Sequence, residues 1–292
     1  MEIKNVIICG LGALGLTYAN KLNDVCELKI LADAERIEKY KKNPPKMNGK
    51  CMELNYITPS DSFSADLVII ATKASGLDSA IKYFRNFVGE NTIIISLING
   101  ISSEEKIATY YKNARVLRSY YIGHSAIRTN NNVTQDGAGK IVIEPSQRLE
   151  DFFKSANICY EVSKDIIYSQ WVKLGVNIIL NEPSALYELT VGELRKKEGY
   201  KQLAQVLLEE VKLVAQRHGL KNLNNYIKDV YDSANLVSDD SKTSMYQDVI
   251  AGRKTEVEIF SGEIIRLGEL YNIATPSNKK IYYQIIEKTS HY

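Results

Sequence analysis

Short runs of apolar residues recur through the first half of the chain, separated by stretches with helical spacing. The apolar runs cover residues 5–10, 27–32, 65–72, 91–98 and 114–121. Runs of this length between amphipathic helices are typical of parallel strands that are buried on both faces. The pattern therefore predicts a doubly wound parallel sheet with helices on both sides.

The second half has a different pattern, because its apolar residues recur every three or four positions. This spacing extends through residues 165–189, 200–220 and 253–272 and predicts a nearly all-helical region. We therefore expect an α/β protein with one domain over residues 1–163 and a helical domain over residues 164–292.

One segment of the first half departs from the strand-helix alternation. Residues 133–145 carry the turn sequence DGAG between stretches of alternating residues. Such a turn favours an antiparallel hairpin. We expect this hairpin at one edge of the sheet.

Three glycines directly follow the first strand. Gly10, Gly12 and Gly15 have G-x-G-x-x-G spacing, and a helical pattern follows them. In this context the glycines allow a tight turn, backbone approach to a diphosphate and close packing of helix on strand, and the helix N-terminus adds partial positive charge. The alternative is a simple glycine-rich turn. We predict a dinucleotide site formed by Gly10, Leu11, Gly12, Ala13, Leu14 and Gly15, which makes the first domain Rossmann-type.

The second strand ends near Asp33, where an acidic residue hydrogen-bonds the ribose hydroxyls of NAD. Three residues later, the guanidinium of Arg36 is able to accept the additional phosphate of NADP instead. The alternative for both is helix-start chemistry, with Asp33 as N-cap and Arg36 solvated. The residues alone leave NAD and NADP open.

The next two strands end at Lys73 and Asn99, and ligands of parallel sheets bind at these carboxyl ends. Ser102 and Glu105 have capping-box spacing and predict a helix after Asn99. Asn99 is therefore expected on the ligand face, as an amide contact to cofactor or substrate. Lys73 lies at the same edge, with a plain surface charge as its alternative role.

Three polar residues share one face of an otherwise apolar helix in the second half. Lys173, Asn177 and Asn181 are spaced i, i+4, i+8. Burying them is costly without partners, so they form either a ligand site or a structural hydrogen-bond network. A desolvated lysine is able to protonate the alkoxide formed when a ketone is reduced. Lys173 is the first candidate for this general acid, and His124 is the second.

Ser244 and Glu256 are further candidates near the end of the chain. In one unbroken helix they would lie about 18 Å apart, too far to serve one small substrate. We therefore expect a helix that begins near Asp248 and leaves Ser244 in a loop. Glu256 is expected inside a helix that buries Val257, and its alternative is an ion pair with Arg253.

Composition narrows the class of protein. The 292 residues are 45% hydrophobic and 25% charged, with a net charge of +2, which indicates a globular protein with no electrostatic footprint for nucleic acid. No signal peptide and no apolar stretch of membrane-spanning length are visible, so we expect a cytoplasmic protein without a membrane partner. The scattered cysteines and three histidines match neither a disulfide frame nor a metal site.

Five segments, in order and spanning nearly the whole chain, resemble the ketopantoate reductase (2-dehydropantoate 2-reductase) family. They are GLGALG, SLING, GHSAIRTNNNVTQDGAGKIVIEP, WVKLGVNIILN and TSMYQDVIAGRKTEVEIFSGEIIRLGELYNIATPSN. The resemblance implies a Rossmann domain joined to a helical substrate and catalytic domain. In this family NADPH reduces 2-dehydropantoate to pantoate, on the route to coenzyme A. Lys173 would be the general acid, Glu256 would hold it, and Lys73 would lie near the nicotinamide ribose.

The same resemblance implies substrate contacts. Asn177 and Asn181 would contact the hydroxyl end of the substrate, and Ser244 and Asn99 would contact its carboxylate end. These residues would also serve other small branched 2-keto acids. A 3-hydroxyacid or polyol-phosphate dehydrogenase would likewise suit a catalytic lysine.

Two features keep alternatives open. Family members commonly carry an arginine near the end of the second strand, whereas this chain has Asp33 there and Arg36 beyond it, so NADH is the alternative to NADPH. A dinucleotide-sensing protein without turnover is the second class of function. Such a sensor has no need of Lys173, Glu256 and Ser244, and their presence favours the enzyme. The sequence leaves a homodimer open.

Overall fold

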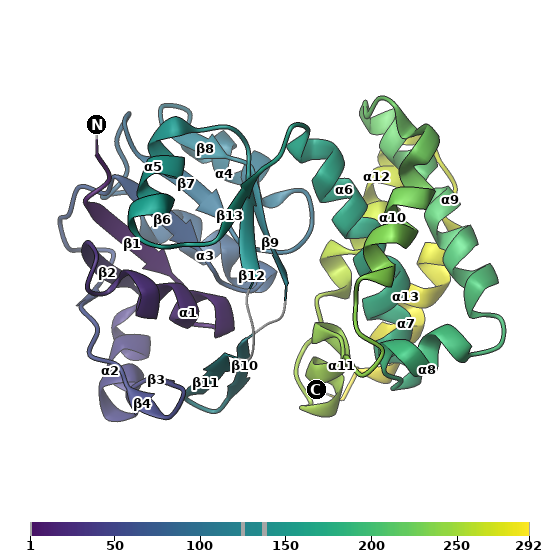
Figure 1. The fold of residues 1–292 in the computed structure, drawn as a ribbon, viewed down its shortest axis with the longest axis horizontal. Coiled ribbons are helices and arrows are strands. Elements are labelled where there is room, and N and C mark those ends of the chain that lie inside the picture. The colour runs from purple at the N-terminus through teal and green to yellow at the C-terminus, as the bar shows by residue number, and fades with distance from the viewer. Residues whose placement is uncertain (1, 124–125, 136–138, 292) are drawn as a thin grey trace. The chain divides into compact units, whose positions relative to one another are not determined.

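The computed structural model describes residues 2–123, 126–135 and 139–291. The chain divides into two compact units, Met1–Ile166 and Ile167–Tyr292. The first unit combines a parallel sheet with helices, and the second is built from helices (Figure 1). The fold class predicted from the hydrophobic pattern is confirmed.

A six-stranded parallel sheet forms the centre of the α/β unit. Its strand order is β5-β2-β1-β6-β7-β8. Leaving out the short strands β3 and β4, this is the order 3-2-1-4-5-6 of a Rossmann-type sheet, whose winding reverses between β1 and β6. The strands are β1 (Asn5–Cys9), β2 (Glu27–Leu31), β3 (Lys46–Met47), β4 (Lys50–Cys51), β5 (Tyr56–Ile57), β6 (Leu67–Ile70), β7 (Ile93–Ser96) and β8 (Arg115–Leu117).

Apolar side chains on both faces of this sheet are buried. Val6 and Ile8 of β1 pack in one core cluster with residues of α1 and α5, while Ile7 faces the other side and is equally inaccessible to solvent. Helix α4 packs on β7 and β8, and α3 packs on α4. The helices of this unit are α1 (Ala13–Leu22), α2 (Ala34–Lys42), α3 (Leu77–Tyr83), α4 (Ser103–Tyr110) and α5 (Gln147–Ser155).

Two smaller sheets complete the α/β unit. One has the order β10-β11-β3-β4, and the other has the order β13-β12-β9. Their remaining strands are β9 (Ser119–Gly123), β10 (Ala126–Thr129), β11 (Asn132–Gln135), β12 (Gly139–Ile143) and β13 (Tyr160–Val162).

The hairpin predicted at the DGAG turn is wrong. The strands on either side of that turn, β11 and β12, belong to different sheets, and residues 136–138 lie outside the described part of the chain. The observed hairpin instead joins β10 to β11 through Asn130 and Asn131. Asn130 has a φ of 55°, a left-handed conformation that asparagine tolerates well in tight turns. Ile141 and Ile143 commit β12 to the core beside β9.

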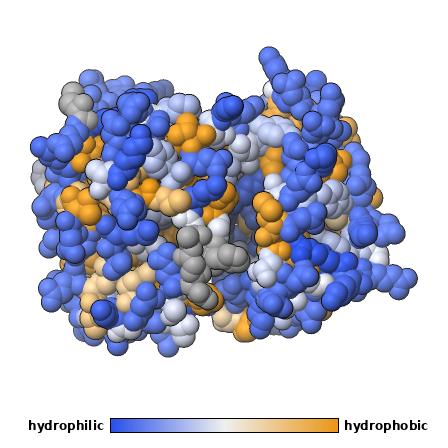
Figure 2. Space-filling view, viewed as in Figure 1, coloured by the Kyte–Doolittle hydropathy of each residue, from blue (hydrophilic) through white to orange (hydrophobic). Residues whose placement is uncertain are grey.

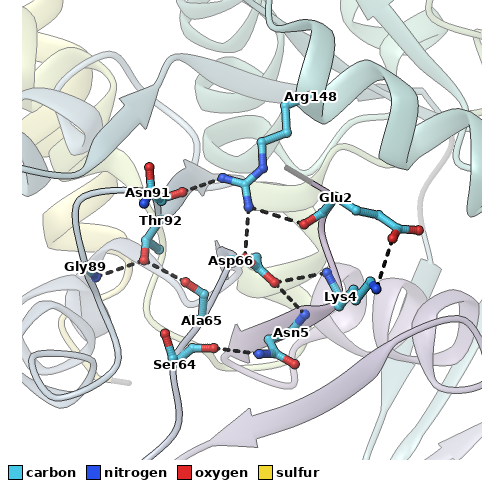
Figure 3. Close-up of polar contacts among 10 residues, drawn as sticks. All are labelled: Glu2, Lys4, Asn5, Ser64, Ala65, Asp66, Gly89, Asn91, Thr92 and Arg148. Atoms are coloured by element: carbon cyan, nitrogen blue, oxygen red, sulfur yellow. Dashed lines mark hydrogen bonds and ion pairs between the residues drawn. The ribbon is translucent and has the colours of Figure 1, made fainter.

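A polar network ties down the amino ends of the central strands (Figure 3). Asp66, just before β6, accepts hydrogen bonds of 3.0 Å from the backbone N–H groups of Lys4 and Asn5 at the start of β1. It also accepts a bond of 2.9 Å from Arg148 of α5, which donates in turn to the carbonyl of Asn91 before β7. These bonds join the starts of β1, β6 and β7 to α5 at the amino edge of the sheet.

The helical unit has a core of its own. Helices α9, α12 and α13 pack on one another, and α7 packs on α11 and α13. The helix predicted from residue 165 onward is interrupted, because Asn177–Asn181 form a π-helical turn between α6 and α7. Its helices are α6 (Ile166–Val176), α7 (Glu182–Tyr187), α8 (Val191–Lys196), α9 (Tyr200–His218), α10 (Tyr226–Asn235), α11 (Ser244–Ile250), α12 (Ser261–Tyr271) and α13 (Pro276–Lys288). Short 3-10 turns lie at Leu223–Asn225 and Val257–Ile259 in this unit and at Ala74–Gly76 in the α/β unit.

Hydrophilic side chains cover most of the face seen in Figure 2, and hydrophobic ones form separate patches on it. Among the described residues, no helix is both long and apolar enough to cross a bilayer. Within the same residues, no three His, Cys, Asp or Glu side chains are grouped so as to hold a metal ion.

Candidate functional site

The glycine loop joins β1 to α1 at the switch point of the sheet. Gly10 has a φ of 99°, and a Cβ there would lie 2.8 Å from Thr72. A Cβ on Gly15 would lie 1.8 Å from the carbonyl oxygen of Gly10, so the fold itself requires both glycines. Gly12 is different, since a Cβ there would meet only the Ala71 carbonyl oxygen at an ordinary 3.6 Å. Packing therefore does not require glycine at position 12, which leaves the approach of a ligand phosphate to the N-terminus of α1 as the reason to expect one.

Asp33 caps α2, as its helix-start alternative required. Its Oδ1 accepts a hydrogen bond of 2.7 Å from the backbone N–H of Arg36, and Tyr83 donates to its Oδ2 at 3.5 Å. The Arg36 side chain is exposed. Asp33 therefore already has protein partners at both carboxylate oxygens, and the Arg36 guanidinium lies one helical turn away.

Two polar residues follow the next strand along the carboxyl edge. Thr72 places a buried Oγ1 that has no hydrogen-bond partner among the described residues, although a buried hydroxyl normally has one. Lys73 is exposed and precedes the 3-10 turn at Ala74–Gly76. Sequence reasoning did not select Thr72 as a candidate, although a polar residue just after a buried strand is a usable signal.

Asn99 follows β7 at the same edge and is half-buried. Its loop rests on a buried network in which the Ser103 hydroxyl lies 2.8 Å from Glu104 and 3.0 Å from the Ser96 hydroxyl. The N–H of Ser119 donates to Glu104 at 3.1 Å. Burial raises the pKa of Glu104, against the lowering effect of these hydrogen bonds. The network joins β7, α4 and β9 beneath the loop and so supports Asn99.

The helix predicted after Asn99 is present as α4, but its start differs from the predicted capping box. Ser102 is the N-cap, and its side chain makes no capping hydrogen bond. Glu105 instead pairs with Arg118 at 2.8 Å. The helix start is stabilised by the buried serine and glutamate contacts rather than by the box.

The π-helical turn is linked to α11 by hydrogen bonds whose direction is fixed. The backbone N–H of Met245 can only donate, and it lies 3.2 Å from Asn181 Oδ1. This oxygen also accepts from the Ser244 hydroxyl at 2.9 Å, and Asn181 Nδ2 donates to Asn177 Oδ1 at 3.0 Å. Asn177 Nδ2 is left as a buried donor without a partner among the described residues. An unmet donor costs about 1–3 kcal/mol, which favours a ligand oxygen beside it.

Lys173 lies on α6, one turn before Asn177, and its side chain is half-buried. The backbone widens into the π-helical turn directly after this helix. Such turns occur frequently at functional sites. His124, the second candidate for the general acid, lies outside the described residues.

Ser244 lies at the first position of α11, so the prediction that it sits in a loop before a helix starting near Asp248 is wrong. Thr243 starts the helix earlier, because its hydroxyl accepts a hydrogen bond of 3.3 Å from the N–H of Tyr246. Helix α11 ends at Ile250, and α12 begins only at Ser261. Ser244 therefore lies at a helix N-terminus, from which its hydroxyl donates to Asn181 of the π-helical turn.

Glu256 lies in the segment between α11 and α12, not inside a helix as predicted. It precedes the 3-10 turn at Val257–Ile259, in which Val257 is buried as expected. Arg253 pairs with Asp248 at 2.8 Å, so the alternative ion pair between Arg253 and Glu256 is replaced by this one. The Asp248 contact braces the turn that leads to Glu256.

Comparison with known proteins decides the family. The family model described as ketopantoate reductase PanE/ApbA matches residues 6–148, and its C-terminal model matches residues 165–289. A 2-dehydropantoate 2-reductase from Aquifex aeolicus is 31% identical over 233 residues, 75% of each chain. The chain belongs to the ketopantoate reductase family. This family consists of oxidoreductases that use a nicotinamide dinucleotide.

Solved structures show the same fold. D-mandelate dehydrogenase, in a ternary structure with NADH and anilino(oxo)acetate, superposes with a TM-score of 0.85 at 22% identity, over 98% of each chain. A ketopantoate reductase from Staphylococcus aureus, described as dimeric, gives a TM-score of 0.78 at 22% identity, also over 98% of each chain. The ketopantoate reductase fold thus extends to a neighbour that is named for a different 2-hydroxy acid.

This member of the ketopantoate reductase family carries a buried carboxyl group directly after Asn181. Glu182 is inaccessible to solvent, and it accepts a hydrogen bond of 2.9 Å from the N–H of Ser261 at the start of α12. Burial raises the pKa of Glu182 to about 8, against the lowering effect of Ser261. Glu182 thereby ties the asparagine-bearing turn to α12. No sequence pattern signalled this link, because the partners are 79 residues apart.

Glu182→Gln is expected to remove a pH dependence of stability. The folded state binds the Glu182 proton more tightly than the unfolded state, so this group contributes stability below its ordinary pKa of 4.5 and loses it as the pH rises through about 8. The variant should therefore gain on the natural protein by up to about 1.4 kcal/mol per pH unit across that window. Denaturant unfolding from pH 5 to 9 measures the difference. Parallel stability curves for the two proteins would contradict the buried neutral acid.

Proposed function

We propose that the protein is an NADPH-dependent 2-dehydropantoate 2-reductase, which makes pantoate for pantothenate and coenzyme A synthesis. Membership of the ketopantoate reductase family supports this class of reaction. The observation that supports 2-dehydropantoate as the substrate is the buried donor Asn177 Nδ2, which lies one helical turn from Lys173. Such a donor suits the hydroxyl oxygen of 2-dehydropantoate.

In this proposal the α/β unit binds the cofactor. The loop from Gly10 to Gly15 receives the diphosphate, for which the space at Gly12 is suited. Lys73 and Asn99 hold the nicotinamide end. When bound, the nicotinamide supplies the hydride.

The helical unit binds the keto acid and supplies the proton. Lys173 Nζ donates a proton to the former keto oxygen, and the Glu256 carboxylate holds the Lys173 ammonium group. Asn177 and Asn181 bind the hydroxyl end. Ser244, together with Asn99, binds the carboxylate by turning its hydroxyl hydrogen from Asn181 to the substrate, while Asn181 keeps its bond from the Met245 N–H.

The test is the oxidation of NADPH or NADH in the presence of each of a panel of 2-keto acids. The loss of nicotinamide absorbance measures it. We expect the highest kcat/KM with 2-dehydropantoate, about 100-fold above 3,3-dimethyl-2-oxobutanoate, which lacks only the hydroxyl group. Asn177→Ala should reduce this preference mainly through KM. A preference unchanged in Asn177→Ala would contradict the hydroxyl contact.

The same assay separates the alternatives. A higher rate with another branched 2-keto acid, or with phenylglyoxylate (the 2-keto acid that is reduced to mandelate) and NADH, would replace 2-dehydropantoate as the proposed substrate. Cofactor binding without turnover of any keto acid would favour a dinucleotide sensor. A homodimer is proposed by analogy with the dimeric relative from Staphylococcus aureus, and light scattering measures it.

A further inference from the structure

Arg128 reaches the glycine loop from a distant part of the chain. It lies in β10, and its Nη1 donates to the carbonyl oxygen of Leu11 at 2.5 Å, across 117 residues. Its Nε donates to the carbonyl oxygen of Asn130 at 2.9 Å. These two bonds use two of the five guanidinium donors. The exposed Arg128 guanidinium therefore lies beside the glycine loop with N–H donors that these two bonds do not use.

The hairpin that carries Arg128 is braced against α2. Asn131 Nδ2 donates to Asn43 Oδ1 at 2.7 Å and to the carbonyl oxygen of Pro44 at 2.8 Å, directly after α2 ends. The N–H of Lys46 donates to the carbonyl oxygen of Asn131 at 2.8 Å. The glycine loop, α2 and the hairpin are therefore held as one assembly within the α/β unit. Such bracing fixes a charged side chain before any ligand arrives.

The charges of Arg36, Arg128 and Asp33 all act on the side chain of Tyr40 in α2. Burial raises the pKa of Tyr40, the positive charges of Arg36 and Arg128 lower it, and the negative charge of Asp33 raises it. The charges of both guanidinium groups therefore act on the Tyr40 side chain, one from α2 and one from β10. Even with Asp33 ionised, the sum of these three formal charges is one positive charge.

We propose that Arg128 and Arg36 together bind the 2′-phosphate of NADP, and that Arg128 is a specificity-determining residue. Asp33 caps α2 by accepting from the Arg36 N–H, and its single negative charge is outweighed by the two arginines. Two guanidinium groups with unused donors are suited to a dianionic phosphate. This inference rests on the dinucleotide binding in the proposed function and adds the reason for preferring NADPH.

The experiment is cofactor binding, measured by nicotinamide fluorescence without any keto acid. Arg128→Gln should raise the Kd for NADPH about 10- to 100-fold and change the Kd for NADH less than threefold, because only NADPH carries the 2′-phosphate. Arg36→Gln should show the same selectivity. The Kd of Arg128→Lys for NADPH should lie between those of the natural protein and Arg128→Gln, because lysine keeps the charge and loses the planar guanidinium. Arg115→Gln, an exposed arginine at the start of β8, is the matched control and should change neither Kd.

The fragment 2′,5′-ADP, compared with ADP, provides a second readout by calorimetry. The natural protein should prefer 2′,5′-ADP, and Arg128→Gln should lose that preference while its melting temperature shows that it is folded. If Arg128→Gln weakened the binding of NADPH and of NADH equally, the proposal would be overturned and Arg128 would be assigned to the diphosphate. Unchanged binding of both, or no binding of either cofactor to the natural protein, would also overturn it. Strong cofactor binding without reduction of 2-dehydropantoate would refute the proposed substrate and leave the Arg128 result standing.

Discussion

Lys173→Ala is expected to lower kcat for keto acid reduction by about 10²- to 10⁴-fold, the usual contribution of a positioned general acid. Lys173 lies on α6, one turn before the buried Asn177 donor. In the proposed function it protonates the former keto oxygen. The Kd for NADPH should stay within about twofold, because in the proposed function the cofactor is bound by the α/β unit. Stopped-flow single turnovers and fluorescence titration separate these quantities.

Two comparisons make the Lys173 result specific. Lys201→Ala, at an exposed position of α9, removes the same side chain from the same unit and should leave kcat unchanged. Lys173→Ala combined with Glu256→Ala should be no slower than the more damaged single variant, because the two residues are proposed to act as one unit. Full kcat in a folded Lys173→Ala protein would remove the lysine from this role.

The Rossmann-type sheet was predictable because its signals are local. Residues 5–10, 65–72 and 91–98 each contain a short unbroken apolar run rich in Ile and Val, which is typical of a strand buried on both faces. The spacing of Asn177 and Asn181 likewise indicated a shared face, and their side chains do form a hydrogen bond. Periodicity carries this information because neighbours along a helix or strand are fixed by backbone geometry.

Most of the failures come from competition between a local signal and a distant partner, and one comes from a local cap that the periodicity does not show. The DGAG turn is a good hairpin signal, but β12 gains more by packing beside β9 in the core. The start of α11 depended on one capping hydroxyl, Thr243, which periodicity does not weigh. Arg128 and Glu182 act through contacts 117 and 79 residues apart, which nothing in the local sequence encodes. Site residues of this kind emerge only from the folded chain.

The three glycines of the loop are expected to separate into two classes when each is replaced by alanine. Gly15→Ala places a Cβ 1.8 Å from the Gly10 carbonyl oxygen, a backbone atom that is unable to move without displacing α1 from β1. Gly12→Ala meets nothing closer than 3.6 Å, and the φ of −71° at this position suits alanine. We therefore expect glycine to be required at position 15 by packing and at position 12 by the approach of the cofactor.

Gly15→Ala should lower the free energy of unfolding by about 3 kcal/mol, the upper range for overpacking, and should abolish measurable NADPH binding. Gly12→Ala should cost less than about 1 kcal/mol of stability, because alanine is only a poorer N-cap than glycine. Its Kd for NADPH should nevertheless rise at least about 30-fold, since a methyl group would occupy the approach of the diphosphate. Chemical denaturation and fluorescence titration measure the two effects side by side. Tight NADPH binding by a stable Gly12→Ala protein would mean that the diphosphate does not approach this loop, and the dinucleotide site would then have to lie elsewhere on the α/β unit.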